Sequence, residues 1–202
     1  MRTPSRQRTD VQRSIDSIID EVCALLSSAA GADYIGEPVS QLTHSLQAAH
    51  YAMQSGASDE LVLGALFHDV GHQCADADAP QMDALGIVDH ERIGARWLAE
   101  RGFSETVCTL VSEHVSAKRY QVYKRAAYRQ ALSPASLGTL AFQGGAMAAH
   151  EAEAFEAHPL FQAILAVRSW DERAKVPNLV VPSLDDHRAR MRAHLSTQRG
   201  SA

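Results

Sequence analysis

The chain has 202 residues, of which 46% are hydrophobic, and this length and composition allow one sizeable domain with a full apolar core. Its formal net charge of −5 argues against a general nucleic-acid-binding protein.

The three cysteines, at positions 23, 74 and 108, show no CxxC spacing, which is typical of reduced thiols. The basic N-terminus is not followed by an apolar run of signal-peptide type. No segment approaches the ~20 apolar residues of a membrane helix. We therefore expect a cytoplasmic protein that acts away from membranes and nucleic acids.

Apolar periodicity, together with Gly and Pro as punctuation, predicts helices along almost the whole chain. We expect residues 1–9 to be disordered and residues 10–198 to form a single all-α domain, a helical bundle. A long polar loop is expected at 73–89, a break at 143–147 and an extended stretch between Pro177 and Pro182. The predicted helices are 11–28, 39–55, 59–70, 90–101, 105–116 with continuation toward 128, one that begins at Pro134, 149–157, 159–172 and 185–196.

Four side chains stand where a helix N-cap is expected, because a side-chain oxygen there can accept from a free backbone N–H of the first turn. They are Ser58, Asp89, Ser104 and Ser133. Ser133 is followed by Pro134, which is favoured at the first position of a helix.

Several potential metal ligands fall within these predicted helices. A single buried histidine is usually a satisfied core residue, but side chains that converge from several helices of a bundle are how such folds build metal sites. The candidates are His44, His68, Asp69, His90, His114 and Asp171.

The adjacent pair His68 and Asp69, in 66-LFHDVGH-72, is the most informative part of this set. Neighbouring helical residues point ~100° apart, so a metal can meet the imidazole from one side and the carboxylate from the other. Since a carboxylate has two oxygens, Asp69 can bridge two metals. Nitrogen and oxygen ligands without thiolate favour iron, manganese or a similar ion over a structural zinc.

Six stretches, spread from about residue 30 to 195, resemble the HD-domain mixed-valence diiron oxygenases. Within these they resemble the branch that cleaves the carbon–phosphorus bond of 1-hydroxy-2-aminoethylphosphonate; myo-inositol oxygenase is a more distant relative. The stretches are 33-DYIGEPVSQLTHSLQAAHYAMQSGA-57, 66-LFHDVGH-72, 89-DHERIGARWL-98, 113-EHVSAKRY-120, 142-FQGG-145 and 168-RSWDERAK-175.

The resemblance implies two irons in the mixed-valent Fe(II)/Fe(III) state, with O2 as co-substrate. One iron would be held by His44, His68 and Asp171, the other by His90 and His114, with Asp69 as the bridge. The small-molecule substrate would be a hydroxyphosphonate supplied by an upstream hydroxylase. The products would be inorganic phosphate and glycine, or glycine betaine if the nitrogen is trimethylated.

The resemblance also gives Tyr34 and Glu37 a role in a loop that closes over the metals until substrate arrives. Gly36 lets this loop turn sharply, and Pro38 is expected to start the helix that carries His44. In the alternative interpretation Tyr34 only packs, and Glu37 only occupies a first helical turn, where the helix dipole favours a carboxylate. We expect Tyr34 and Glu37 to be catalytic and to bind substrate.

Three further groups share predicted helix faces with the ligands, because residues three or four apart are neighbours on a helix. Lys118 follows His114 by four residues, Arg168 precedes Asp171 by three, and His72 follows His68 by four. Arg and Lys suit a phosphonate dianion, although exposed ion pairs are the alternative for both. His72 is expected to be catalytic as well as substrate-binding.

The resemblance adds Ser136 and Gln143 as contacts to the phosphonate. Arg119 and Lys175 are expected to be solvated charges.

Two other classes of function remain open on the residues alone. The same six ligands suit a metal-dependent phosphohydrolase that acts on a small phosphate ester or nucleotide without a redox metal. A non-catalytic, metal-stabilised signalling module is the third class, and it would need neither a lid nor anion-binding groups.

Overall fold

The computed structural model describes residues 13–31 and 37–200. Within these ranges the regular elements are helices, and no strand longer than a single-residue bridge occurs. The all-α prediction is therefore confirmed. The predicted disorder of residues 1–9 lies outside the described residues, and the domain limits 10–198 stay a prediction.

Many of the helices follow one another with short connections, while longer segments precede α2, α5 and η1. In chain order they are α1 (Ile15–Ser28), α2 (Gln41–Gln54), α3 (Asp59–Phe67), α4 (Gly71–Cys74), α5 (His90–Ala99), α6 (Glu105–Lys124), α7 (Ala126–Ala131), α8 (Pro134–Phe142), α9 (Ala149–Glu156), α10 (Phe161–Arg173), the 3-10 helix η1 (Asp185–His187) and α11 (Arg188–Gly200).

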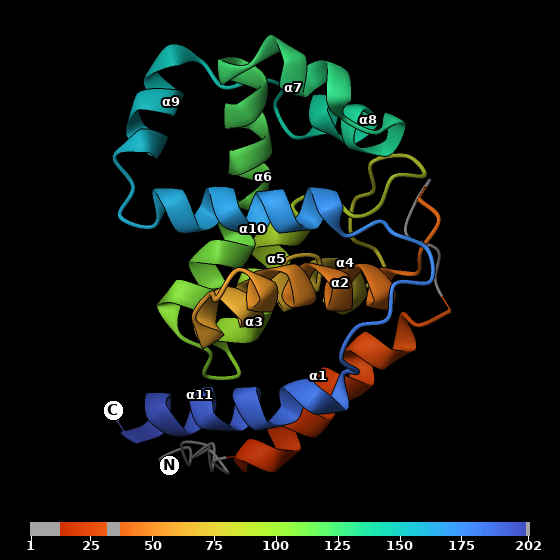
Figure 1. Ribbon diagram of the computed structural model, residues 1–202, viewed down its shortest axis with the longest axis vertical. Coiled ribbons are helices and arrows are strands. Elements are labelled where there is room, and N and C mark those ends of the chain that lie inside the picture. Colours follow the sequence, from red (N-terminus) through yellow and green to blue (C-terminus); the bar gives the residue numbers. More distant parts are fainter. Residues whose placement is uncertain (1–12, 32–36, 201–202) are drawn as a thin grey trace, which may run out of the picture.

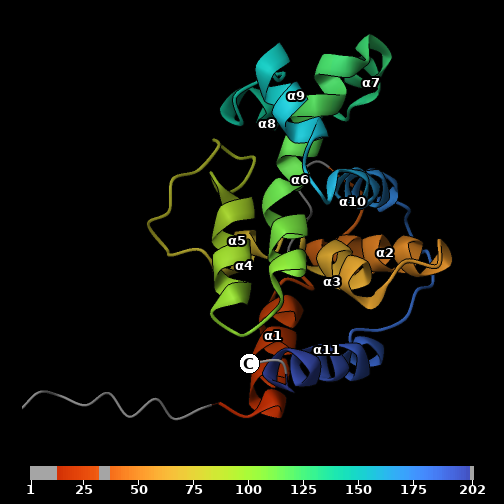
Figure 2. The same cartoon turned by 90° about the vertical axis from the view of Figure 1, so that its left-hand side faces the viewer.

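The 20-residue helix α6 is the centre of the arrangement (Figure 1). It packs against α5 on one side and against α3 and α10 on the other, and α2 packs on α3 and α10. Figure 2 shows α4 and α5 on one side of α6, and α2, α3 and α10 on the opposite side. Helices α7, α8 and α9 lie at one end of α6, while α1 and α11 pack together at the other end of the molecule (Figure 1).

The apolar core explains why α3 lies inside this arrangement. All residues from 62 to 67 are buried, as expected of a helix that is hydrophobic on every side. Gly64 lets α3 approach α6 closely, because a Cβ at this position would lie 2.7 Å from Cδ1 of Leu110. Phe67 at the end of α3 packs edge-on against Phe103, with ring centroids 5.2 Å apart.

A second close approach joins α4 to α5. A Cβ on Gly71 would lie 1.8 Å from the carbonyl oxygen of His90, and one on Gly94 would lie 2.9 Å from the backbone nitrogen of Gly71. Because no side chain fits between them, the two backbones are in direct contact here.

The helix predicted over 59–70 ends earlier, at Phe67. The N–H of Val70 donates to the carbonyl of Phe67, and the N–H of His72 donates to that of Asp69. These bonds span three residues instead of four, so the α-helical ladder is interrupted and a new short helix starts at Gly71. His68 and Asp69 therefore lie in a turn between two helices and not inside one.

The expected start of α2 at Pro38 is also wrong. The helix begins at Gln41, because the Ser40 side chain accepts the N–H of Thr43 and so caps the first turn. Predicted caps are confirmed at Ser104 and Ser133, whose side chains accept from Val107 and Ser136.

Ser58 and Asp89 stand at N-cap positions but make no side-chain capping bond. Asp89 instead has a positive φ of 56°, which turns the chain into α5. The predicted run from 105 toward 128 is a single helix only to Lys124, since Arg125 is extended and separates α7 from it. The other predicted helices are present with shifted ends.

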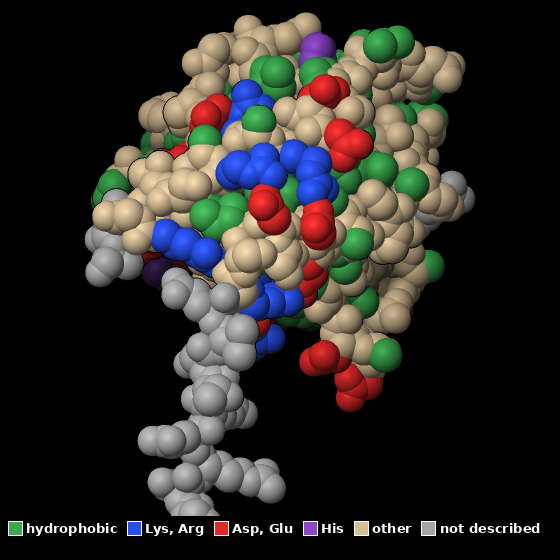
Figure 3. All heavy atoms as spheres, turned by 90° about the horizontal axis from the view of Figure 1, so that it is seen from below, with side chains coloured by type: hydrophobic (Ala, Val, Ile, Leu, Met, Phe, Trp, Pro, Cys, Tyr) green, Lys and Arg blue, Asp and Glu red, His purple; other side chains and the backbone are tan. Residues whose placement is uncertain are grey.

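Three arginines of α11 are paired with acidic side chains. Arg192 bonds to Asp16 of α1 at 2.5 Å, and Arg190 bonds to Asp59 at 2.6 Å. Seen from below, basic and acidic side chains lie next to one another on this face (Figure 3). Among the described residues, no helix combines the length and apolar character needed to cross a membrane.

Candidate metal centre

The six predicted ligands converge from five parts of the fold. His44 lies on α2, His114 on α6 and Asp171 on α10, while His90 is the first residue of α5. His68 and Asp69 are supplied by the turn between α3 and α4. All six side chains are buried, so the structure brings the predicted set together in one place.

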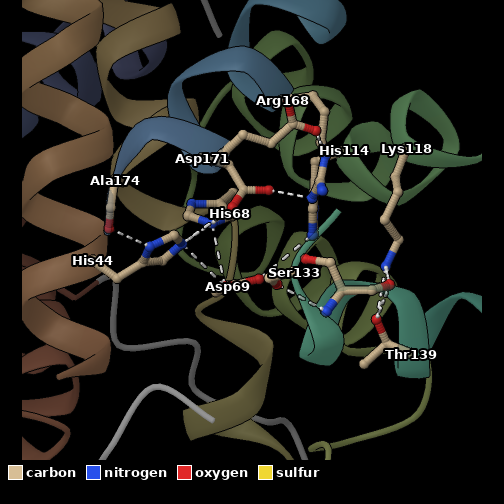
Figure 4. Close-up of polar contacts among 12 residues, drawn as sticks. His44, His68, Asp69, His114, Lys118, Ser133, Thr139, Arg168, Asp171 and Ala174 are labelled. Carbon is tan, nitrogen blue, oxygen red and sulfur yellow. Dashed lines mark hydrogen bonds and ion pairs between the residues drawn. The ribbon is translucent and has the colours of Figure 1, made fainter. Parts of the chain in front are cut away.

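One group gathers around the Oδ2 side of Asp69. The Nε2 atoms of His44 and His68 lie 3.0 Å apart. Oδ2 of Asp69 lies 3.2 Å from Nε2 of His68, and Oδ1 of Asp171 lies 3.3 Å from Nε2 of His44. Figure 4 shows His44, His68 and Asp171 gathered beside Asp69.

A second group gathers around the other oxygen of Asp69. Oδ1 lies 3.4 Å from Nε2 of His90 and 3.4 Å from Nε2 of His114, and these two nitrogens are 3.2 Å apart. The donor atoms His44–His68–Asp69 and Asp69–His90–His114 each fall within 4.8 Å of one another. Asp69 is common to both groups, as a carboxylate that bridges two cations would be.

In all four histidines, Nδ1 forms a hydrogen bond with a backbone carbonyl. The partners and distances are Ala174 for His44 at 2.8 Å, Ala65 for His68 at 2.8 Å, Ile87 for His90 at 3.2 Å and Val111 for His114 at 2.8 Å. Because a carbonyl only accepts, each ring carries its proton on Nδ1 and presents Nε2 to the centre. Bonds of this kind orient imidazole ligands in metal proteins.

The electrostatics of the centre favour positive charge. Burial would raise the pKa of Asp69, but His68 and the other histidines beside it hold the pKa well below its usual range. Burial would lower the pKa of His68, yet Asp69 and Asp171 raise this pKa to about 9. The two buried carboxylates thus stabilise a cation at this point, either a proton on His68 or a metal ion.

A pocket adjoins this centre, and every predicted substrate residue in the described part of the chain lines it. These residues are Glu37, His72, Lys118, Ser136, Gln143 and Arg168. Sequence reasoning missed Thr139, although it lies three residues after Ser136 and so on the same face of α8.

Lys118 is a buried cation in this pocket. Its Nζ donates to Oγ1 of Thr139 at 2.8 Å and to the carbonyl of Ser136 at 3.4 Å (Figure 4). Burial, followed by the nearby Arg168, lowers the pKa of Lys118 to about 7. The hydroxyl of Thr139 and the carbonyl of Ser136 are both uncharged, so the positive charge of Lys118 is available to an anion. The alternative of an exposed ion pair does not apply.

Arg168 is equally buried, and it is held by three partners. It donates to Oδ2 of Asp171 at 2.5 Å, to Oε1 of Glu172 at 2.9 Å and to the hydroxyl of Tyr128 at 3.0 Å. Asp171 and Tyr128 are the main groups that, against the effect of burial, raise the pKa of Arg168. The guanidinium is therefore a permanent charge tied to a candidate metal ligand.

His72 lies flat against His90, with ring centroids 3.9 Å apart and planes 18° from parallel. Its Nδ1 accepts the N–H of Ile87 at 3.1 Å, so the neutral ring carries its proton on Nε2. Burial, followed by the neighbouring His90, lowers the pKa of His72 to about 3. His72 is thus a neutral hydrogen-bond donor on the wall of the pocket.

Gln143 ends α8. Its Oε1 is buried and finds no hydrogen-bond partner among the described residues. A buried acceptor of this kind costs free energy unless a group that donates a hydrogen bond, such as water or a ligand hydroxyl, satisfies it.

Two charges predicted to be solvated are not. Lys175 lines the pocket and donates to Oε1 of Glu37 at 2.5 Å. Arg119 bonds to Glu151 at 2.9 Å and to the carbonyl of Gly145 at 3.1 Å. Tyr34 and its predicted role lie outside the described residues.

Comparison with known proteins supports the family resemblance seen in the sequence. Residues 42–142 match the HD domain family. The chain is 36% identical to an uncharacterised protein of Acanthamoeba polyphaga mimivirus, over 88% of this chain and 82% of the relative.

Two further relatives have named activities. The [1-hydroxy-2-(trimethylamino)ethyl]phosphonate dioxygenase (glycine-betaine-forming) of Leisingera caerulea is 36% identical, over 82% of this chain and 84% of the relative. The hydroxymethylphosphonate dioxygenase of Gimesia maris is 39% identical, over 78% of each chain. By these matches the chain belongs to the HD-domain family, and over most of its length it is related to proteins named as phosphonate dioxygenases.

Proposed function

We propose that the chain is a dioxygenase that uses O2 to cleave the carbon–phosphorus bond of a small 1-hydroxyphosphonate. The observation that carries this proposal is the position of Asp69, whose two oxygens face two separate histidine pairs. The two named relatives support the reaction class.

The residues fit two metal ions. His44, His68 and Asp171 would hold one, His90 and His114 would hold the other, and Asp69 would bridge them. Four imidazoles and two carboxylates without thiolate suit iron, and we propose a mixed-valent Fe(II)/Fe(III) pair. When bound, the irons supply the redox chemistry of O2, while the protein supplies position, charge and exclusion of water.

The phosphonate group is proposed to bind between Lys118 and Gln143. Lys118 offers a buried positive charge bonded to uncharged groups, and Gln143, which lines the same pocket, can donate to a phosphonate oxygen through its amide nitrogen. Arg168 adds permanent positive charge beside them. Ser136, whose carbonyl bonds Lys118, completes this side of the pocket.

His72 is proposed to orient the substrate by donating through Nε2, because its Nδ1 is occupied by Ile87. A neutral donor at this point can hold the hydroxyl group without adding charge to the centre. Tyr34 and Glu37 keep their proposed roles in closing the pocket, with Glu37 as the group that meets a cationic nitrogen.

Candidate substrates are 1-hydroxy-2-aminoethylphosphonate and its N-trimethylated form, which would give glycine or glycine betaine together with phosphate. Hydroxymethylphosphonate, named for one relative, would give formate and phosphate. In each case one O2 adds one oxygen to carbon and one to phosphorus. A separate hydroxylase is proposed to supply the substrate.

The test is to load the protein anaerobically with iron and then to add O2 with each candidate substrate. We expect phosphate release by 31P NMR that matches O2 uptake, two irons per chain, and a coupled electron paramagnetic resonance signal after partial oxidation. A His44→Ala variant should lose the reaction. Release of phosphate from a phosphate ester with magnesium or manganese and no O2 would instead identify a phosphohydrolase.

A further inference from the structure

The ion pair between Lys175 and Glu37 lies on the wall of the pocket beside the metal centre. The two charged atoms are 2.5 Å apart, and their side chains are 18% and 9% exposed. Nζ of Lys175 also lies 3.3 Å from Oγ of Ser133. Because solvent has little access, this pair is stronger than an ordinary surface salt bridge.

The backbone on both sides of Lys175 is fixed. The carbonyl of Ala174 accepts from Nδ1 of His44 at 2.8 Å. On the other side, Gln47 bonds both the N–H and the carbonyl of Val176, at 3.0 and 2.7 Å. The backbone of Lys175 is therefore held in place from α2, on the same pocket wall as Glu37.

The pair changes the charge that a substrate meets. Glu37 is the carboxylate proposed for a cationic nitrogen, and a carboxylate bonded to a lysine has already lost much of its attraction for a second cation. An ammonium group that enters must share Glu37 with Lys175 or displace it. A substrate without nitrogen leaves the pair intact, and Lys175 then adds positive charge near the phosphonate.

We propose that Lys175 is a specificity-determining residue, which competes for Glu37 and so shifts selectivity away from ammonium-bearing 1-hydroxyphosphonates toward those without nitrogen. This inference rests on the proposed function, and it assigns to Lys175 a role in choosing the substituent on the carbon next to the reacting one.

The experiment compares Lys175→Met with the wild type. Met keeps most of the side-chain length but removes the charge. We measure kcat/KM for 1-hydroxy-2-aminoethylphosphonate and for hydroxymethylphosphonate, and we measure binding of each to the iron-loaded protein without O2 by calorimetry. We expect the ratio of amino to nitrogen-free substrate to rise about tenfold or more in both measurements, because a partly buried cation no longer opposes the ammonium.

Three variants act as controls. Lys175→Arg should keep the wild-type ratio, because it retains the charge. Glu37→Gln added to Lys175→Met should abolish the gain, because no carboxylate remains for the ammonium. Lys124→Met should have no effect, since Lys124 pairs with Glu156 on the exposed surface. Lys175→Gln provides a second neutral side chain if the Met variant does not fold.

An unchanged ratio in a folded Lys175→Met or Lys175→Gln variant would overturn the inference and leave the proposed function standing. A raised ratio that persists after Glu37→Gln would also overturn it. If wild-type protein loaded with iron cleaves no 1-hydroxyphosphonate, the proposed function falls and the inference falls with it.

Discussion

Arg168, which lies about one turn before Asp171 on α10, donates to Oδ2 of Asp171 at 2.5 Å. Oδ1 of the same carboxylate lies 3.3 Å from Nε2 of His44. Asp171 thus uses one oxygen toward the candidate metal centre and the other toward a buried cation of the substrate pocket. A change in charge at Arg168 therefore acts directly on Asp171, which is a candidate metal ligand.

We predict that Arg168→Ala keeps two irons per chain but lowers kcat/KM by about a hundredfold or more, since removal of one member of a buried charge pair costs roughly 3–5 kcal/mol. Metal analysis and steady-state kinetics test this prediction. Arg173→Ala is the matched control, because Arg173 is on the same helix and lies over the ring of Tyr51 instead. Unchanged kinetics in a folded Arg168→Ala protein would refute the role in substrate binding.

Asp69→Ala should abolish both metal occupancy and turnover, because it removes a ligand from both proposed ions at once. Asp76→Ala, on the exposed loop after α4, should bind metal normally. The metal content of both variants, measured by inductively coupled plasma mass spectrometry, tests this prediction. Retention of two irons by Asp69→Ala would show that the carboxylate does not bridge.

Lys118→Met should make the metal-free protein more stable near neutral pH, although it weakens substrate binding. Burial lowers the pKa of Lys118 from 10.5 to about 7 in the folded protein. Between these two values the unfolded chain holds more protons, so the wild type gains stability as pH rises from about 7 to about 10.5. At pH 6.5 the charged amine costs several kcal/mol.

Urea unfolding at pH 6.5 and 9.5 measures this effect. The advantage of Lys118→Met over the wild type should be large at pH 6.5 and small at pH 9.5, while Lys124→Met should show no such change. A difference that is the same at both pH values would mean that Lys118 titrates normally.

His187 should make the wild type sensitive to acid. It is fully buried, its Nδ1 lies 3.3 Å from Nη1 of Arg190, and its Nε2 has no partner in the described part of the chain. Burial and Arg190, opposed by Asp186, lower the pKa of His187 from 6.5 to about 4. Since the unfolded chain takes up the proton first, stability is lost as pH falls from about 6.5 to about 4.

We expect metal-free wild type to lose about 2 kcal/mol more than His187→Leu between pH 7 and pH 5, measured by urea unfolding. Chelation beforehand removes any contribution from metal release. His150→Leu, at an exposed position, should behave as the wild type. Parallel losses in the wild type and His187→Leu would contradict the assignment.

The helical character and the six ligands could be predicted because they depend on local patterns. Apolar periodicity marks a helix, and His and Asp at helical spacing mark a shared face. The turn at His68 and Asp69 could not be predicted in this way. It depends on contact between Gly71 and the carbonyl of His90, which are 19 positions apart in the printed sequence.

Lys175 shows the same limit for charge. Its sequence neighbours give no reason to bury it, and its partner Glu37 lies 138 residues away. The start of α2 shows a similar limit. Pro38 and Ser40 both favour a helix start, and the sequence alone did not show that the helix begins after Ser40. Contacts between residues far apart in the chain determine the surroundings of residues such as Lys175, and a single sequence does not show which residues come into contact.

The backbone contact between Gly71 and Gly94 has a consequence for how the centre can vary. Asp69 lies just before one side of this contact and His90 begins the helix on the other side, so main-chain atoms limit how closely these two candidate ligands approach. A methyl group at position 71 would lie 1.8 Å from the carbonyl oxygen of His90 and would push Asp69 and His90 apart, so we expect this position to tolerate no residue larger than glycine.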